Sequence, residues 1–296
     1  APLPMYHILC LIATLMFMKL GGQTVLITNP RDLPAFVKEL AGLKFTAMLG
    51  INTLFSGLLN TPGFEQLDFS ALKFVGAGGA ATQKPVAERW QKVTGTYVSE
   101  GYGLTETSPI VCFMPLGTAW DGTVGFPIPS TEVSIRDGEF NELPVWTGDG
   151  DIERHTGEIC VRGPQVMKGY WQNSAETANV LRDGWLKTGD IGHLDDTGRV
   201  TITDRKKDMI LVSGFNVYPN EIESVVAAHP GVLECAAVAV PDEKTGEAVK
   251  VVIVRKDPNL ARESVIEHCR ASLTSYKVPR HVEFRDALPK TPIGKI

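Results

Sequence analysis

The chain has 296 residues, enough for one large domain or for a large domain followed by a small one. Hydrophobic residues make up 43% and charged residues 21%, which is the balance of a globular chain and not of a disordered one. The formal net charge of −5, with no block of like charges, argues against nucleic acid as the main partner.

The cysteines and histidines lack the spacing of a metal site. The cysteines are scattered, odd in number and without a CxxC pair, so we expect buried thiols in a reducing, cytoplasmic compartment. The histidines also fail to pair at ligand spacing, which argues against a structural metal. The cysteines are Cys10, Cys112, Cys160, Cys235 and Cys269.

The strongest apolar run, from Ile8 to Met18, is about half the ~20 residues that a bilayer-spanning helix needs. It has neither the basic start nor the small-residue cleavage site of a signal peptide. We therefore predict a buried helix here.

Short strand-like runs alternate with helical stretches through the first half, which predicts an α/β fold with a largely parallel sheet and helices on its faces. Glycine follows several of these runs, and loops at the carboxyl ends of parallel strands are where α/β folds bind ligands. The predicted strands are Thr24–Thr28, Phe45–Leu49 and Leu72–Gly76, and the predicted helices are Leu33–Leu40 and Pro85–Val93.

From about residue 115 to residue 203, proline, glycine and short extended segments predict a β-rich subdomain. Its predicted strands are Glu132–Ile135, Glu158–Arg162 and Arg199–Thr203. Within it, the acidic segment from Glu139 to His155 is expected to be a surface loop.

A small α+β unit is predicted after the charged cluster Asp204–Asp208, so we place the domain boundary between residues 206 and 207. A helix should open at Tyr218–Glu223, with proline in its first turn and acids that favour the helix dipole, and end at His229–Gly231. The other predicted elements are strands Met209–Val212, Cys235–Val240 and Val249–Val254 and the helix Arg262–Leu273.

The segment Val98–Thr107, which reads VSEGYGLTET, carries the most chemical information. Its strand should end near Glu100, and Gly101 and Gly103 allow the backbone to approach a ligand closely. Tyr102 offers a flat face for a base, and Thr105 and Glu106 offer a hydroxyl and a carboxylate that suit phosphate and Mg²⁺. Taken alone, the segment could equally be a glycine-rich turn with a surface acid.

Three further segments are ambiguous when each is taken alone. Asp190 in Trp185–Gly192 could bind both hydroxyls of a ribose or simply form a turn. Asp204–Glu223 could be a solvated charge cluster before a helix, and the lysine near the end of Leu288–Ile296 could be solubilising.

Together, and in this order, the segments resemble the adenylate-forming superfamily, which comprises acyl-CoA synthetases, luciferases and peptide-synthetase adenylation domains. The resemblance covers essentially the whole chain and is nearest to bacterial long-chain-fatty-acid–CoA ligases. The matching segments include Leu3–Ile8, Ile27–Asp32, Gly163–Met167 and Asp204–Glu223.

The resemblance implies that a carboxylate attacks the α-phosphate of ATP to give acyl-AMP and pyrophosphate, and that CoA then displaces AMP. It implies that the enzyme uses ATP and Mg²⁺, with CoA as a co-substrate. Glu106 would be the Mg²⁺ ligand, and Thr105 would contact phosphate. Tyr102 would stack on adenine between Gly101 and Gly103.

The resemblance also gives roles to the remaining candidates. Lys295 would bridge the substrate carboxylate and the α-phosphate, where a placed ammonium stabilises developing charge. Lys207 would be the hinge about which the small domain rotates, and Gly214 would then approach the pantetheine of CoA. The adenine and acyl pocket would be lined by Gly78, Gly79 and Ala80, the ribose would be held by Asp190 and Arg205, and the acyl gate would be formed by Tyr6 and His7.

The sequence departs from the family pattern at both ends. The phosphate-binding loop rich in Ser, Thr and Gly, which the family has upstream of Pro2–Ile8, is absent, and the chain stops at Ile296 where relatives continue. We therefore expect a fragment with weak ATP binding and little turnover.

Two alternatives to a long-chain-fatty-acid–CoA ligase stay open: an adenylating ligase for a medium-chain, aryl or amino acid, and an inactive nucleotide-binding fragment. The apolar or glycine-rich region around Ile51 and Gly76–Ala80 favours a fatty acid over an amino acid, whose ammonium usually needs an aspartate. A fatty-acid substrate implies peripheral contact with the inner face of the membrane, and relatives often form homodimers.

Overall fold

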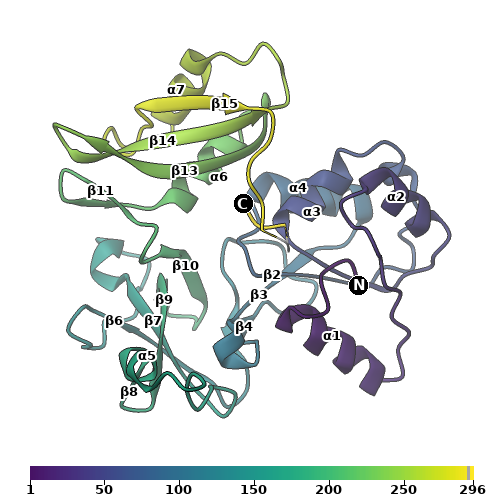
Figure 1. Cartoon of the computed structure of the whole chain (residues 1–296), viewed down its shortest axis with the longest axis horizontal. Coiled ribbons are helices and arrows are strands. Elements are labelled where there is room, and N and C mark those ends of the chain that lie inside the picture. The colour runs from purple at the N-terminus through teal and green to yellow at the C-terminus, as the bar shows by residue number, and fades with distance from the viewer. Residues whose placement is uncertain (292–293) are drawn as a thin grey trace. The chain divides into compact units, whose positions relative to one another are not determined.

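The structure is a computed structural model that describes residues 1–291 and 294–296 and divides into two compact units. Unit 1 comprises Ala1–Thr188, Gly192–Ile202 and Pro292–Lys295, and unit 2 comprises Gly189–Ile191, Thr203–Thr291 and Ile296 (Figure 1). The predicted domain boundary between residues 206 and 207 lies in the turn that follows β10 (Val200–Arg205), the strand within which unit 1 gives way to unit 2. This boundary stays a proposal.

The first sheet of unit 1 has the strand order β1-β2-β3-β4-β5. The first three strands are parallel and the last two are antiparallel, so the sheet is mixed, with a parallel half that carries the glycine-rich loops. The strands are β1 (Ala47–Gly50), β2 (Phe74–Gly78), β3 (Val98–Tyr102), β4 (Cys112–Phe113) and β5 (Phe126–Pro127).

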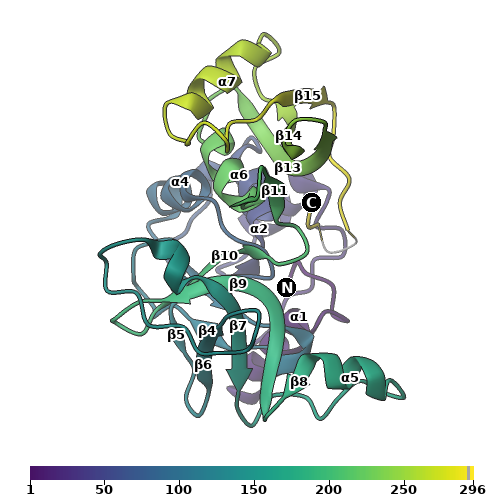
Figure 2. The same cartoon turned by 90° about the vertical axis from the view of Figure 1, so that its left-hand side faces the viewer.

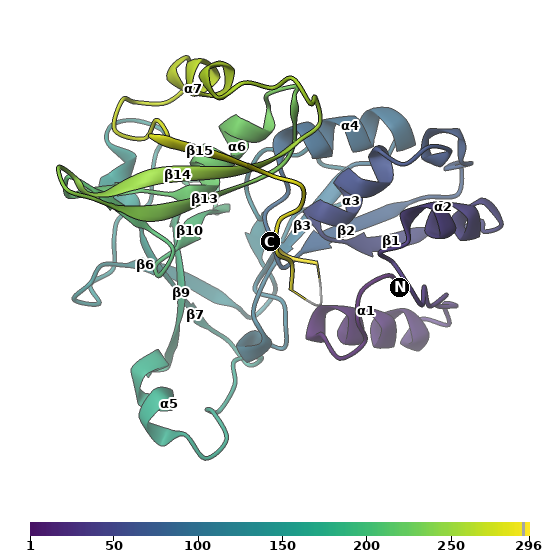
Figure 3. The same ribbon diagram turned by 45° about the horizontal axis from the view of Figure 1, so that its top comes forward.

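Helices α3 and α4 lie on one side of the parallel strands and α1 lies on the other (Figures 1 and 3). The main core of this unit is built from α2, α3, α4 and the sheet, with Phe55, Phe64 and Trp90 fully buried. The Phe55 and Trp90 rings meet edge to face at 4.7 Å. The helices are α1 (Ile8–Lys19), α2 (Leu33–Ala41), α3 (Asn52–Leu59) and α4 (Lys84–Thr94), and a 3-10 turn, η1, spans Phe64–Gln66.

Helix α1 forms where it was predicted, but the expectation that it is buried is wrong. Its buried residues are Cys10, Ala13 and Thr14, whereas Leu15 is 51% exposed and Met18 is 60% exposed. The helix meets the sheet through one side only, where Phe17 contacts Phe74. No helix in the described part of the chain is both long and apolar enough to span a bilayer.

A second prediction is also wrong, because Thr24–Thr28 forms no strand in the described structure. Val25 is 39% exposed and Leu26 is 56% exposed, and the backbone here bonds to Ala1 instead of to a sheet. β-Branched residues favour a strand only where a neighbouring strand and a buried face are available.

The second sheet has the order β10-β9-β7-β6, with β8 paired to the start of β9 (Figure 2). Its core includes the fully buried Ile159, Val161 and Val200, which confirms the β-rich region of the predicted fold class. The elements are β6 (Glu132–Arg136), β7 (Gly157–Arg162), α5 (Ser174–Val180), β8 (Leu181–Arg182), β9 (Trp185–Leu194) and β10 (Val200–Arg205), with 3-10 turns η2 (Thr105–Thr107) and η3 (Ile152–His155).

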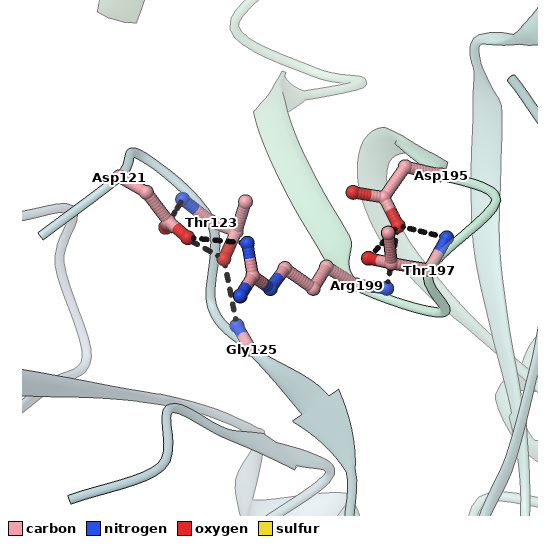
Figure 4. Close-up of polar contacts among 6 residues, drawn as sticks. All are labelled: Asp121, Thr123, Gly125, Asp195, Thr197 and Arg199. Atoms are coloured by element: carbon pink, nitrogen blue, oxygen red, sulfur yellow. Dashed lines mark hydrogen bonds and ion pairs between the residues drawn. The ribbon is translucent and has the colours of Figure 1, made fainter. Parts of the chain in front are cut away.

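Polar contacts tie the turn before β10 to the loop before β5 (Figure 4). Arg199 forms an ion pair with Asp121 at 3.1 Å, and Asp121 also accepts from the backbone and hydroxyl of Thr123. Asp195 closes its own turn by accepting from the Thr197 and Arg199 backbone. These bonds hold together two loops that are distant in sequence.

Unit 2 contains a sheet in the order β12-β11-β14-β13, and β15 pairs with β14 in parallel. Helices α6 and α7 complete a core that includes the fully buried Ile222, Ile253 and Val265. The elements are β11 (Ile210–Val212), β12 (Phe215–Val217), α6 (Pro219–Ala227), β13 (Val232–Asp242), β14 (Gly246–Arg255), α7 (Arg262–Arg270) and β15 (His281–Arg285).

The cysteines are free and buried, as predicted. The segment from 139 to 155 lies largely at the surface, also as predicted, although Phe140 is buried with the Arg136 guanidinium 4.3 Å from its ring centroid.

Candidate functional site

The loop after β2 contains three of the predicted pocket residues, and its backbone is tied to the neighbouring strand. Gly78 is buried and Ala80 is exposed, while Gly79 between them has φ of +84°, a conformation that favours glycine. The backbone N–H of Thr82 donates to the Glu100 carboxylate at 2.7 Å. The loop is thereby tied to the neighbouring strand β3.

Glu100 is a residue to which the sequence pattern gave no role. It is 6% exposed, and burial raises the pKa of its carboxyl to about 7. The only sequence signal was an acid near the end of a predicted strand, within the segment Val98–Thr107.

Lys295 lies directly against this loop. Its Nζ is 3.3 Å and its Cε 3.2 Å from the position that a Cβ on Gly79 would occupy. The preceding residue is anchored on α3, because the Thr53 hydroxyl donates to the Gly294 carbonyl at 2.8 Å. Residues 292 and 293 of the same predicted motif lie outside the described residues.

A small cavity beside Lys295 is lined by residues from α1, its approach and the first sheet. Burial, and then the charge of Lys295, lower the pKa of His7 and so disfavour its protonated form. Tyr6, the other predicted gate residue, is 75% exposed. The lining residues are Leu3, His7, Leu9, Ile51, Gly78 and Lys295.

The end of β3 holds the next group of candidates. Tyr102 is only 8% exposed and packs in the same core cluster as Val111 and Cys112, so little of its ring is open to a base. At Gly103 a Cβ would lie 1.6 Å from the Pro109 carbonyl oxygen, so this glycine is required by the chain's own backbone. Gly101 has intermediate burial, and Thr105 is exposed.

Glu106 is held by a tyrosine that the sequence analysis did not identify. The Tyr170 hydroxyl donates to Glu106 Oε1 at 2.9 Å, and the Met167 backbone N–H donates to the Glu106 carbonyl at 2.8 Å. Burial, and then this hydrogen bond, raise the pKa of Tyr170 to about 12, so the phenol donates at neutral pH. Its only sequence signal was an aromatic close to the Gly163–Met167 match.

The carboxylate of Glu106 fits a magnesium ligand. The second oxygen of this carboxylate, Oε2, forms no hydrogen bond or ion pair with residues 1–291 or 294–296. Mg²⁺ is commonly held by one or two carboxylates, with substrate phosphates and water completing its octahedron. One oxygen of this carboxylate is therefore available to such an ion.

In unit 2, Asp190 and Arg205 lie side by side on β9 and β10. Arg205 Nε is 3.7 Å from Asp190 Oδ1, and the side chain of Asp190 is 13% exposed against 52% for Arg205. The Lys206 N–H donates to the Gly189 carbonyl at 2.9 Å, which fixes the backbone beside Asp190. A carboxylate can accept hydrogen bonds from the two hydroxyls of a ribose, and a guanidinium beside it can donate to their oxygens.

The other two candidates of unit 2 lie in exposed turns. Lys207 is in the turn between β10 and β11, and Gly214 is in the turn between β11 and β12 with φ of +84°. Asp204, at the end of β10, accepts from the Asn220 N–H at 2.9 Å and so joins the strand before the Lys207 turn to α6.

Family models match most of the chain. A model described as AMP-binding enzyme matches residues 1–171, and one described as AMP-binding enzyme C-terminal domain matches residues 221–295.

Curated relatives match over the full chain. The long-chain-fatty-acid–CoA ligase of Escherichia coli O157:H7 is 55% identical over 99% of this chain and 51% of that protein. The feruloyl-CoA synthase of an Amycolatopsis species is 36% identical over 99% of this chain and 58% of that protein. The chain thus spans about half the length of the curated relatives it matches.

Solved structures agree with the fold. The ATP-bound MatB of Rhodopseudomonas palustris is 32% identical with a TM-score of 0.85, covering 99% of this chain and 57% of that one. The o-succinylbenzoate-CoA synthetase MenE of Bacillus subtilis, in complex with its acyl-adenylate OSB-AMP, is 27% identical with a TM-score of 0.82 over 98% and 57%.

Proposed function

Because the chain belongs to the AMP-binding enzyme family, we propose that it is part of an enzyme that activates a long-chain fatty acid with ATP and transfers it to CoA. The identity of 55% to long-chain-fatty-acid–CoA ligases supports this substrate. The observation that carries the chemistry is the position of the Lys295 ammonium against the glycine-rich loop at Gly79.

In the first step a carboxylate oxygen of the fatty acid attacks the α-phosphorus of ATP. The bond between the α-phosphorus and the oxygen that bridges the α- and β-phosphates breaks, and pyrophosphate leaves. Negative charge grows on the α-phosphoryl oxygens, and the ammonium of Lys295 stabilises that charge where water is excluded. Gly78, Gly79 and Ala80 line the acyl and adenine pocket, and the missing side chain at Gly79 leaves room for the lysine.

Three residues near the end of β3 bind the nucleotide in this proposal. Tyr102 stacks on adenine between Gly101 and Gly103 through the small part of the residue that is exposed, and Thr105 donates its hydroxyl to phosphate. Glu106 holds Mg²⁺, which when bound neutralises charge on the phosphate oxygens. In unit 2, Asp190 accepts from the ribose hydroxyls and Arg205 orients Asp190.

In the second step the CoA thiol loses its proton to solvent and the resulting thiolate attacks the acyl carbon. The C–O bond between the acyl carbon and AMP then breaks, and AMP leaves with its electron pair. Lys207, which is exposed in its turn at the proposed domain boundary, is the hinge about which the small domain rotates between the first and the second step. The turn at Gly214 then approaches pantetheine, since no atom lies within 4 Å of a Cβ there.

The proposal places the reaction in the cytoplasm, in keeping with free, buried cysteines. Peripheral contact with membrane lipid follows from a fatty-acid substrate, and a homodimer follows from the resemblance to relatives.

The experiment is carboxylate-dependent exchange of labelled pyrophosphate into ATP, with long-chain, medium-chain, aryl and amino acids compared at equal concentration. Exchange greatest with long-chain acids, followed by acyl-CoA formation when CoA is added, is the expected result. Exchange greatest with an aryl or amino acid would overturn the substrate. No exchange with any acid, in this chain or in one extended to the relatives' length, would overturn the catalytic function.

A further inference from the structure

The segment Met167–Tyr170 contacts Glu106 at two points. Its first residue donates its backbone N–H to the Glu106 carbonyl, and its last residue donates the phenol hydroxyl to Oε1. One short segment therefore fixes both the backbone and the carboxylate of Glu106. A bond to backbone alone would leave the side-chain torsions of a glutamate free.

Tyr170 is itself held in place by the start of α5. Its backbone N–H donates to the Thr177 hydroxyl at 2.9 Å, and that hydroxyl donates to the Asn173 carbonyl at 2.8 Å. The preceding Gly169 has φ of +146°, and a Cβ there would lie 2.7 Å from Thr177 Cγ2. The phenol is thus placed by packing and hydrogen bonds that involve no part of the nucleotide site.

We propose that Tyr170 is a positioning residue for Mg²⁺: its hydroxyl occupies Oε1 of Glu106 and presents Oε2 alone to the ion. The inference rests on the proposed function, in which Glu106 is the Mg²⁺ ligand. Mg²⁺ requires near-ideal octahedral geometry with short bonds, so a carboxylate held to one free oxygen favours it over larger ions that accept both oxygens. Groups that orient a metal ligand typically contribute about 10–100-fold in metal affinity.

The test is the Mg²⁺ dependence of ATP binding, measured by titration calorimetry on the chain extended to its relatives' length and on the same protein with Tyr170→Phe. Removing only the hydroxyl should raise the Mg²⁺ concentration for half-maximal binding about tenfold or more, by analogy with other residues that orient metal ligands. The same variant should bind ATP without metal as wild type does, and it should lose less affinity with Ca²⁺ than with Mg²⁺. Tyr97→Phe, a hydroxyl removed from a 37% exposed tyrosine in the same unit, is the matched control.

A second variant keeps the test independent of folding. In a Glu106→Gln background the Tyr170→Phe change should have no further effect on the Mg²⁺ dependence, because the two groups act together. Equal Mg²⁺ dependence of wild type and Tyr170→Phe, or an undiminished effect in the Gln background, would overturn the inference and leave the proposed function intact. Absence of Mg²⁺-dependent ATP binding in wild type would overturn both.

Discussion

The ammonium group of Lys295 lies 3.3 Å from the place that a Cβ on Gly79 would take, so the second-last residue of the chain meets the loop after β2. Both residues belong to unit 1, and Gly294 is anchored on α3 in the same unit. The backbone contact of the residue before it therefore holds the lysine at the loop where a ligand of a parallel sheet is expected.

Replacing Gly79 by alanine should impair adenylation more than it impairs stability. The new methyl group meets the end of a flexible lysine, which must move, and φ of +84° costs an L-residue about 1–2 kcal/mol. Gly95→Ala is the control, since Gly95 has φ of +73° but no atom within 4 Å of a Cβ. Equal pyrophosphate exchange in the two variants at equal loss of stability would contradict the role of this contact.

Asp190→Asn should weaken ATP binding by about tenfold, a loss of about 1.4 kcal/mol, through weaker hydrogen bonds to the ribose. The variant should bind 2′,3′-dideoxy-ATP as wild type does, because that ligand lacks the hydroxyls. Calorimetric titration measures both, with the exposed Asp196→Asn as control. An equal loss of affinity for ATP and its dideoxy analogue would exclude Asp190 from ribose binding.

Glu100 gives the fold a measurable pH dependence. Its folded pKa, about 7, lies above its ordinary value of 4.5, so between these values the native state holds a proton that the unfolded state has released. Stability should therefore fall as pH rises through this window, by about 3 kcal/mol at most. Glu223 has a similarly raised pKa, so one substitution removes only part of the effect.

Glu100→Gln should then stabilise the chain at pH 8 relative to pH 5, because the amide keeps an acceptor for the Thr82 N–H without a buried charge. Denaturant unfolding at both pH values measures this, with the exposed Glu139→Gln as control. A Gln variant whose stability changes with pH as much as wild type would contradict the burial argument.

Much of the fold could be predicted from periodicity and composition, because most helices and strands form where the local sequence pattern favours them. Helix α6, with proline in its first turn, and the strands β6 and β7 lie close to where they were expected. The strand predicted at Thr24–Thr28 does not form, because strand formation depends on a partner strand, which no local pattern reveals. The burial of α1 was overestimated because an apolar run does not say how much of it a neighbour covers.

For the site, motifs identified the segments but not the groups that hold them. Tyr170 and Glu106 are far apart in sequence, and only the folded chain brings the phenol to the carboxylate. Glu100 read as one more residue of a strand, although it holds the loop at Thr82. Such contacts depend on tertiary packing between segments that are distant in sequence, and no local sequence pattern encodes that packing.

The edge-to-face pair of Phe55 and Trp90 should carry much of the stability of unit 1. Both side chains are fully buried, so Phe55→Ala should cost about 3–5 kcal/mol through lost burial and a cavity. Trp171→Ala should change stability by less than about 0.5 kcal/mol, since that side chain is 89% exposed. Unfolding midpoints in urea measure both, and similar losses would refute this picture of the core.

The central claim is that the ammonium of Lys295 serves the adenylation step, and Lys295→Ala tests it most directly. The measurement is pyrophosphate exchange with a long-chain fatty acid in the chain extended to its relatives' length, beside transfer to CoA from acyl-AMP supplied ready-made. The exposed Lys256→Ala serves as the control. The account predicts that exchange falls by a factor on the order of 10²–10³ while transfer to CoA changes little. Exchange that survives the loss of Lys295, or a loss of both steps alike, would contradict it.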